Sequence, residues 1–194
     1  MITPETYAAN LALAEHAKKI SGVIVECGVW RGGMSAGLAE ILGAEREYYL
    51  FDSFEGLPPA KDIDGPAAQA WQQDKSSPNY HDNCTASQAE AEATLKRSPA
   101  RNVHLIAGWF NETLPHSAPD KPIALLRLDS DWYDSTMTCL ETLYPRVAMG
   151  GLVIIDDYYA WDGCSRAVHD YFSRHQLPVR LREHFPSVAY FFKG

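Results

Sequence analysis

VIVECGVWRGG, residues 23–33, joins a short apolar run to a turn that contains three glycines. A helix is predicted to follow over about residues 35–42, and a second apolar run, YYLF at 48–51, ends at Asp52. An apolar strand, a glycine turn, a helix and another apolar strand are together typical of a βαβ unit. Because both strands are apolar throughout, the sheet is expected to be covered by helices on both faces.

The chain on either side of this unit continues to alternate strands and helices. The last two β segments, 179–182 and 188–192, are expected to pair antiparallel at the sheet edge. The alternation predicts a single α/β domain over residues 1–194 with a mostly parallel sheet. The other predicted elements are an N-terminal helix capped by Thr3 with Pro4 first, a helix at 85–97 capped by Thr85 with Gln88, strands at 103–107, 123–128 and 152–155, and helices at 135–144 and 163–175.

Residues 55–84 interrupt this alternation, because they are rich in proline and show little periodicity. Such long loops are uncommon in compact domains and are usually functional. The segment is predicted to be a mobile lid without regular structure. Since the chain leaves no room for a separate substrate domain, residues 55–84 are also expected to do most of the acceptor selection.

The composition argues against nucleic acid and membranes as partners. Lys and Arg number 17 against 25 Asp and Glu, a net charge of −8, whereas phosphate binding needs a basic face. The apolar runs are too short to span a bilayer. The four cysteines are scattered and form no CxxC pair, which favours reduced thiols over a zinc site. A cytoplasmic protein is expected.

The first two predicted strands end in residues suited to a nucleoside. Ligands of doubly wound sheets bind beyond the carboxyl ends of the strands. Glu26 and Gly28 belong to an E-x-G-x-x-x-G pattern, and Asp52 ends the next strand, where an acid commonly binds ribose hydroxyls. Together the three residues favour an adenosine ligand. The alternative is that the glycines only form a turn.

The fourth and fifth predicted strands end in carboxylates, RLDSD at 127–131 and IIDD at 154–157. Asp129, Asp156 and Asp157 directly follow buried apolar runs, and a hard divalent cation would relieve their repulsion. The alternatives are helix capping, which is preferred for Asp134, and plain solvation. Arg127 either balances these carboxylates or forms a salt bridge elsewhere. Tyr158, Tyr159 and Trp161 form either an acceptor wall or part of the core.

Several motifs carry a resemblance to a known family. VECGVWRGGMSA, FDSFEGLP, GWFNETLP, LRLDSDWYDST, GGLVIIDDY and CSRAVHDYF, in order over about residues 22–172, resemble the TylF/MycF/NovP family of macrocin-type O-methyltransferases. The resemblance implies the class I methyltransferase Rossmann-like fold, with a seven-stranded sheet, an antiparallel C-terminal strand, and a cofactor and metal core at 22–157. It also implies a divalent cation, Mg²⁺ or, in its place, Ca²⁺ or Mn²⁺. The site residues implied are Glu26, Gly28, Ser35, Asp52, Ser53, Gly108 and Trp109 for S-adenosylmethionine, Asp129, Asp156 and Asp157 for the cation, with Asp129 also catalytic, and Asp131 as the general base.

The expected activity is methylation of a hydroxyl group on a sugar or other small natural product, with a glycoside or polyhydroxylated metabolite as the acceptor. A sugar hydroxyl is a far weaker acid than an aspartic acid of pKa about 3.9, so the cation is expected to matter more than the base. The alternatives are a catechol-type O-methyltransferase and a non-catalytic nucleoside-binding protein. A nicotinamide oxidoreductase is disfavoured by the glycine spacing. The oligomeric state is open, with a homodimer among the expectations.

Overall fold

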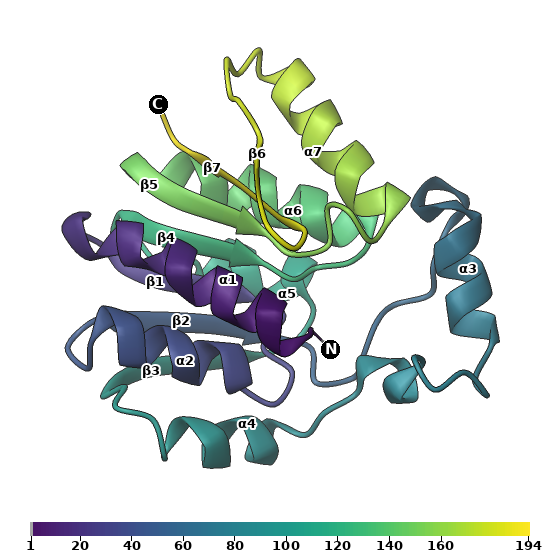
Figure 1. Cartoon of the computed structure of the whole chain (residues 1–194), viewed down its shortest axis with the longest axis horizontal. Helices are drawn as coiled ribbons and strands as arrows, with labels where there is room; N and C mark the ends of the chain where they lie inside the picture. Colours follow the sequence, from purple (N-terminus) through teal and green to yellow (C-terminus); the bar gives the residue numbers. More distant parts are fainter. Residues whose placement is uncertain (1) are drawn as a thin grey trace.

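A seven-stranded β-sheet runs through the middle of the computed structural model, which describes residues 2–194 (Figure 1). The strands lie in the order β3-β2-β1-β4-β5-β7-β6, so the two strands of the predicted βαβ unit, β1 and β2, are neighbours in the sheet and β1 pairs with the central strand β4. The strands are β1 (Val23–Cys27), β2 (Glu47–Asp52), β3 (Asn102–Ala107), β4 (Ile123–Leu128), β5 (Val147–Ile155), β6 (Arg182–His184) and β7 (Val188–Phe192).

Strands β1 to β5 are parallel, and β7 runs antiparallel to both β5 and β6. This confirms the predicted mostly parallel sheet with an antiparallel pair at its edge. The position of β6 was predicted wrongly, because it pairs through residues 182–184 rather than 179–182. Val179 and Leu181, whose apolar character suggested the strand, pack against the core instead.

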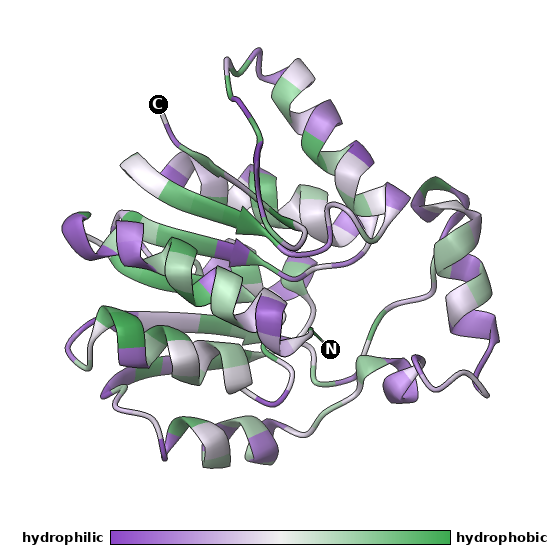
Figure 2. Ribbon diagram, viewed as in Figure 1, coloured by the Kyte–Doolittle hydropathy of each residue, from purple (hydrophilic) through white to green (hydrophobic). Residues whose placement is uncertain are grey.

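Two layers of helices cover the sheet. Helices α1, α2 and α4 pack on one face over a core that includes Leu13 and Leu38, and α5, α6 and α7 pack on the other over Leu140 and Val168. In Figure 2 the central strands are predominantly apolar, as a sheet covered on both faces requires. These helices are α1 (Pro4–Ala14), α2 (Gly33–Leu42), α4 (Gln88–Leu95), α5 (Phe110–Ser117), α6 (Tyr133–Leu143) and α7 (Asp162–Arg174), with short 3₁₀ turns η1 (Glu15–Lys19) and η4 (Tyr144–Arg146).

The helix caps agree with the sequence only in part. Thr3 caps α1 as predicted, since its hydroxyl accepts from the Thr6 N–H at 3.2 Å. Helix α4 begins later than predicted, because its capping box is formed by Ser87 and Glu90 rather than Thr85 and Gln88. Helix α5 was not predicted at all, and its sequence contains Pro115.

Residues 55–84 are more regular than the sequence suggested. They contain two 3₁₀ turns, η2 (Asp62–Asp64) and η3 (His81–Cys84), and helix α3 (Gly65–Gln73). The prediction of a segment without regular structure was therefore wrong. Pro66 occupies the first turn of α3, where proline is tolerated, so a proline-rich segment can still contain a helix. Figure 1 places α3 beyond the carboxyl ends of the central strands.

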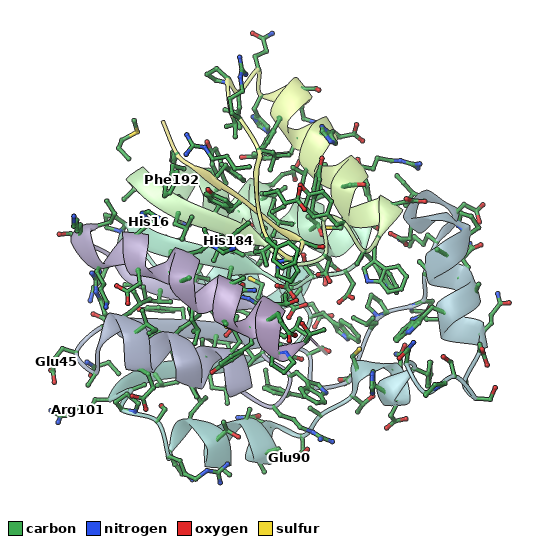
Figure 3. The ribbon with its side chains drawn as sticks, in the orientation of Figure 1. His16, Glu45, Glu90, Arg101, His184 and Phe192 are labelled. Carbon is green, nitrogen blue, oxygen red and sulfur yellow. The ribbon has the colours of Figure 1, made fainter. Side chains whose placement is uncertain are left out.

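The amino ends of the strands form the opposite end of the molecule. There Arg101 and Glu45 form an exposed ion pair at 3.0 Å, and Figure 3 shows both side chains far from α3. Within residues 2–194, no helix has the length and apolar character needed to span a membrane.

Candidate active site

A cavity of about 900 Å³ opens where β1, β2, β4 and β5 end. Residues from these strand ends and from the segment after β2 line it together. The lining includes Glu26, Gly28, Trp30, Asp52, Ser53, Leu57, Pro58, Lys61, Asp64, Cys84, Trp109, Arg127, Asp129, Asp131, Trp132, Met137, Thr138, Asp156 and Asp157. Nearly all of the predicted site residues therefore meet in one place; Ser35 and Gly108 do not line the cavity.

Gly28 brings the ends of β1 and β4 into contact. Its φ is +91°, and a Cβ atom placed on it would lie 1.9 Å from the carbonyl oxygen of Asp129. Only glycine fits a left-handed backbone this close to another chain segment. The close approach sets the Glu26 strand beside the strand that carries the acidic residues.

Glu26 is fully buried at the cavity wall and is held on both oxygens. Its Oε1 accepts from Arg127 Nη1 at 2.8 Å, and its Oε2 accepts from the Ser35 hydroxyl. Burial raises the pKa of Glu26 to about 7, although Arg127 and Ser35 both lower it. Ser35 was predicted to contact the cofactor, but it supports Glu26 from α2.

The Asp52 carboxylate organises the glycine turn. Its Oδ2 accepts from the N–H groups of Val29 and Trp30, and its Oδ1 from that of Phe54, all at 2.7 Å. A carboxylate has about four acceptor positions, so one remains for a ligand hydroxyl. Ser53 lies beside it and donates to the carbonyl of Gly56 at 3.1 Å.

Asp129, Asp156 and Asp157 form a cluster in which one carboxylate oxygen from each lies within 4.8 Å of the others. Burial raises the pKa of Asp129, although the charge of Arg127 lowers it, and burial followed by the charge of Asp131 raises the pKa of Asp157. Oxygen donors at this spacing fit a hard divalent cation such as Mg²⁺ or Ca²⁺. Asp134 does not cap α6 as predicted; it lies in the first turn and pairs with Lys61.

Asp131 has a left-handed backbone with φ 51° and is held at two points. Its N–H donates to Asp157 Oδ2, and its Oδ1 accepts from Trp161 Nε1, both at 3.0 Å. Burial and the charge of Asp129 raise its pKa to about 7. A carboxylate with that pKa, open to the cavity, is suited to accept a proton at neutral pH.

The aromatic residues after Asp157 do not line the cavity. Trp161 supports Asp131 by the hydrogen bond described above, and Tyr158 shares a hydrogen bond of 2.8 Å with Nε2 of His169. Tyr159 is 49% exposed. Of the two sequence-based alternatives, the acceptor wall is not supported.

Asn10 also takes part in the site, although the sequence analysis did not predict it. This α1 residue is fully buried, and its amide donates to Asp156 Oδ1 at 3.1 Å and accepts from Arg127 Nε at 3.1 Å. The only available signal was a polar residue on the apolar face of a helix. Arg127 pairs with the carboxylates of Glu26, Asp129 and Asp156. Of its two predicted roles, balancing the carboxylates is therefore correct, and a salt bridge elsewhere is not.

The strand order, the reversed β7 and the cavity at the strand ends define a class I methyltransferase fold. The solved structure of the O-methyltransferase NovP superposes with a TM-score of 0.79 at 27% identity, over 95% of this chain and 79% of that one. The calicheamicin methyltransferase CalS11 superposes with a TM-score of 0.72, also at 27% identity, over 97% and 78%.

The chain belongs to the macrocin O-methyltransferase (TylF) family, whose model matches residues 9–193. A tetracenomycin rhamnosyl 4'-O-methyltransferase of Streptomyces olivaceus is 38% identical over 91% of this chain. The mycinamicin III 3''-O-methyltransferase of Micromonospora griseorubida is 36% identical over 84%. These alignments span 67% and 65% of the two relatives, so the chain corresponds to about two thirds of their length.

Proposed function

We propose that this chain transfers the methyl group of S-adenosylmethionine to a hydroxyl group of a sugar carried by a natural product. The observation that carries the proposal is the meeting of the β1 glycine turn, the carboxylate cluster and Asp131 in one cavity. The name of the tetracenomycin relative, which places its acceptor on a rhamnosyl group, supports a sugar hydroxyl.

The proposed cofactor site lies along the ends of β1 and β2. Glu26, Asp52 and Ser53 supply hydrogen-bond acceptors there, and Trp109 supplies an aromatic wall. S-adenosylmethionine would bring a sulfonium methyl group that is already electrophilic. The task of the chain is then to hold the acceptor oxygen in line with that group and to exclude water, which can contribute several kcal/mol.

Asp129, Asp156 and Asp157 are the proposed cation ligands, because their three oxygens fit a hard divalent ion. A bound Mg²⁺ would lower the pKa of an acceptor hydroxyl. Asp131 would receive the proton from that hydroxyl, since it lies next to the cluster and Trp161 fixes its carboxylate. Leu57, Pro58 and Lys61, which line the cavity from residues 55–84, are proposed to contact the acceptor.

The proposal is tested first by calorimetric titration with S-adenosylhomocysteine, with and without MgCl₂. Binding is expected in both conditions, and absence of heat in both would refute the proposal. The second step offers S-adenosylmethionine and Mg²⁺ with a panel of rhamnosides and of simple catechols. Methylation of the sugars is expected to be lost in chelator, and exclusive turnover of the catechols would reassign the acceptor class.

A further inference from the structure

Arg127 lies fully buried among the carboxylates of the candidate active site. Its Nη1 is 2.8 Å from Glu26 Oε1 and 3.0 Å from Asp129 Oδ2, and its Nη2 is 3.0 Å from Asp156 Oδ1. One guanidinium therefore touches three carboxylates. Two of them, Asp129 and Asp156, belong to the cluster that fits a divalent cation.

The fold keeps the guanidinium at this position. Glu26 of β1 and Arg127 of β4 are direct neighbours in the parallel register, so their side chains leave the sheet on the same face. Asn10 of α1 closes that face, because it accepts from Arg127 Nε and donates to Asp156 Oδ1. Only 1% of the Arg127 side chain is exposed, although the residue contributes to the wall of the cavity.

The contact between Arg127 and Asp156 is a contact between opposite charges rather than a hydrogen bond. Nη2 of Arg127 has no hydrogen-bond geometry to any residue within 2–194, although it lies beside Asp156. Burial opposes the charge of the guanidinium, but Asp156, Asp129 and Glu26 together hold its pKa well above the ordinary arginine value. A buried carboxylate cluster needs a positive partner to persist, and Arg127 supplies one that is part of the chain.

We propose that Arg127 is a built-in counter-ion of the cation site. It positions Glu26, Asp129 and Asp156 in the absence of a divalent ion, and it weakens the binding of that ion because its own positive charge stays beside the ligands. The inference rests on the proposed function only in taking Asp129, Asp156 and Asp157 as the cation site. The further claim is that the Arg127 charge determines how much the stability of the fold depends on a bound divalent cation.

The test uses the full chain with Arg127→Met and measures thermal unfolding in chelator and over a series of MgCl₂ concentrations. In chelator, the variant is expected to unfold at a lower temperature than the wild type, since three carboxylates lose their counter-charge. Mg²⁺ is expected to raise its Tm more than that of the wild type. Because a unit charge beside the site is removed, the apparent Kd for Mg²⁺ should tighten by about tenfold or more.

Arg46→Met is the matched control. Arg46 also anchors its surroundings, but it does so by donating to the backbone carbonyl oxygens of Ala17, Lys18, Ile20 and Gly22 rather than to carboxylates. Its replacement is expected to lower the Tm and leave the Mg²⁺ response unchanged. Arg127→Lys keeps the charge but cannot span three carboxylates, so it should lower the Tm while the apparent Mg²⁺ Kd stays near the wild-type value.

Arg127→Gln, which keeps amide donors, is the second neutral variant in case the methionine variant does not fold in chelator. Folding of either neutral variant upon addition of Mg²⁺ supports the proposal. A wild-type Mg²⁺ response in both, or failure of both to fold even in excess Mg²⁺, overturns it. Failure of the wild type to bind S-adenosylhomocysteine would count against the proposed function alone, because these measurements need neither cofactor nor acceptor.

Discussion

Asp131 combines a left-handed backbone with two fixed hydrogen bonds. A non-glycine residue in this conformation costs on the order of 1–3 kcal/mol and persists only where its surroundings hold it. Here Asp157 holds the backbone N–H and Trp161 holds the carboxylate. The neighbouring residues therefore aim the Asp131 carboxylate before any acceptor arrives.

Asp131→Asn is expected to lower turnover of the best sugar acceptor by about 10²- to 10⁴-fold, because an amide cannot accept the proton. Affinity for S-adenosylhomocysteine should stay at the wild-type value. Initial rates and calorimetry on the same preparation measure both. Turnover at the wild-type rate would exclude Asp131 as the base.

Gly28→Ala is expected to destabilise the fold by more than about 1 kcal/mol, since the new methyl group would meet the Asp129 carbonyl and the backbone would be strained. Chemical denaturation measures the change in the free energy of unfolding. Gly33→Ala is the matched control. A Cβ atom at Gly33 meets no atom within 4 Å, so the α2 helix should tolerate alanine without loss. Equal losses in the two variants would contradict the explanation.

For individual residues, the sequence predicted which residue types lie at the strand ends, but it did not predict their hydrogen-bond and ion-pair partners. The carboxylates of Asp129, Asp156 and Asp157 follow apolar runs, and the parallel topology alone brings them together. The role of Asn10 depends on how α1 packs across the sheet, and local sequence patterns do not predict that packing. Likewise, Ser35 could be recognised as a polar residue near the turn, but only its rotation on α2 shows that it faces Glu26.

Asp64 joins the segment of residues 55–84 to the helix that follows β4. It is 2% exposed, and its Oδ1 accepts from the N–H of Tyr133 in the first turn of α6 at 2.7 Å. Its Oδ2 accepts from the N–H of Lys61 at 2.8 Å. One side chain therefore serves both η2 and α6, and it docks the segment beside the cavity.

Asp64→Ala is expected to cost about 1–2 kcal/mol, as loss of a helix cap does. It should also speed limited proteolysis within residues 55–84, because the segment loses its attachment to α6. Ser87→Ala removes a cap of α4 and is the control: a similar stability loss is expected without faster cleavage at 55–84. Identical cleavage patterns in the two variants would show that Asp64 does not dock the segment.

The elements that the sequence predicted well are those with strong periodicity or buried runs, such as β1, β4 and α7. The elements it missed, α3 and α5, contain prolines that local rules read as breakers. Pro66 lies in the first turn of α3, where proline is tolerated, whereas Pro115 lies inside α5 and removes one backbone hydrogen bond of that helix. Both helices are short. Their stability comes from contacts with α6, α7 and the sheet, which a local reading does not include.

For the whole molecule, the buried carboxylates predict an unusual pH dependence of stability. Burial raises the pKa of Glu26 and of Asp131 to about 7, and raises that of Asp129 and Asp157. Between their unfolded and folded pKa values, the folded chain binds protons that the unfolded chain does not. The stability that these groups contribute is full below the unfolded values and is lost as the pH rises through about 7.

In chelator, the Tm is therefore expected to fall as the pH is raised from about 5 to about 8. Thermal unfolding in a buffer series measures this slope. Asp157→Asn removes one of the responsible groups and should flatten it. A Tm that rises over the same range in the wild type would contradict the buried carboxylates as its cause.

The strand order also determines at which stage of folding the candidate active site can form. Residue 26 pairs with residue 127, and Asn10 meets Asp156, so the site joins parts of the chain that are 146 positions apart in sequence. Contacts of such long range form late, because the entropy of closing the intervening loops must be overcome first. During synthesis, a nascent chain whose residues after β5 are still inside the ribosome lacks the proposed cation site, because Asp156 and Asp157 follow that strand. Under the proposed assignment, divalent ions are expected to stabilise only the nearly finished fold and not to guide its early folding.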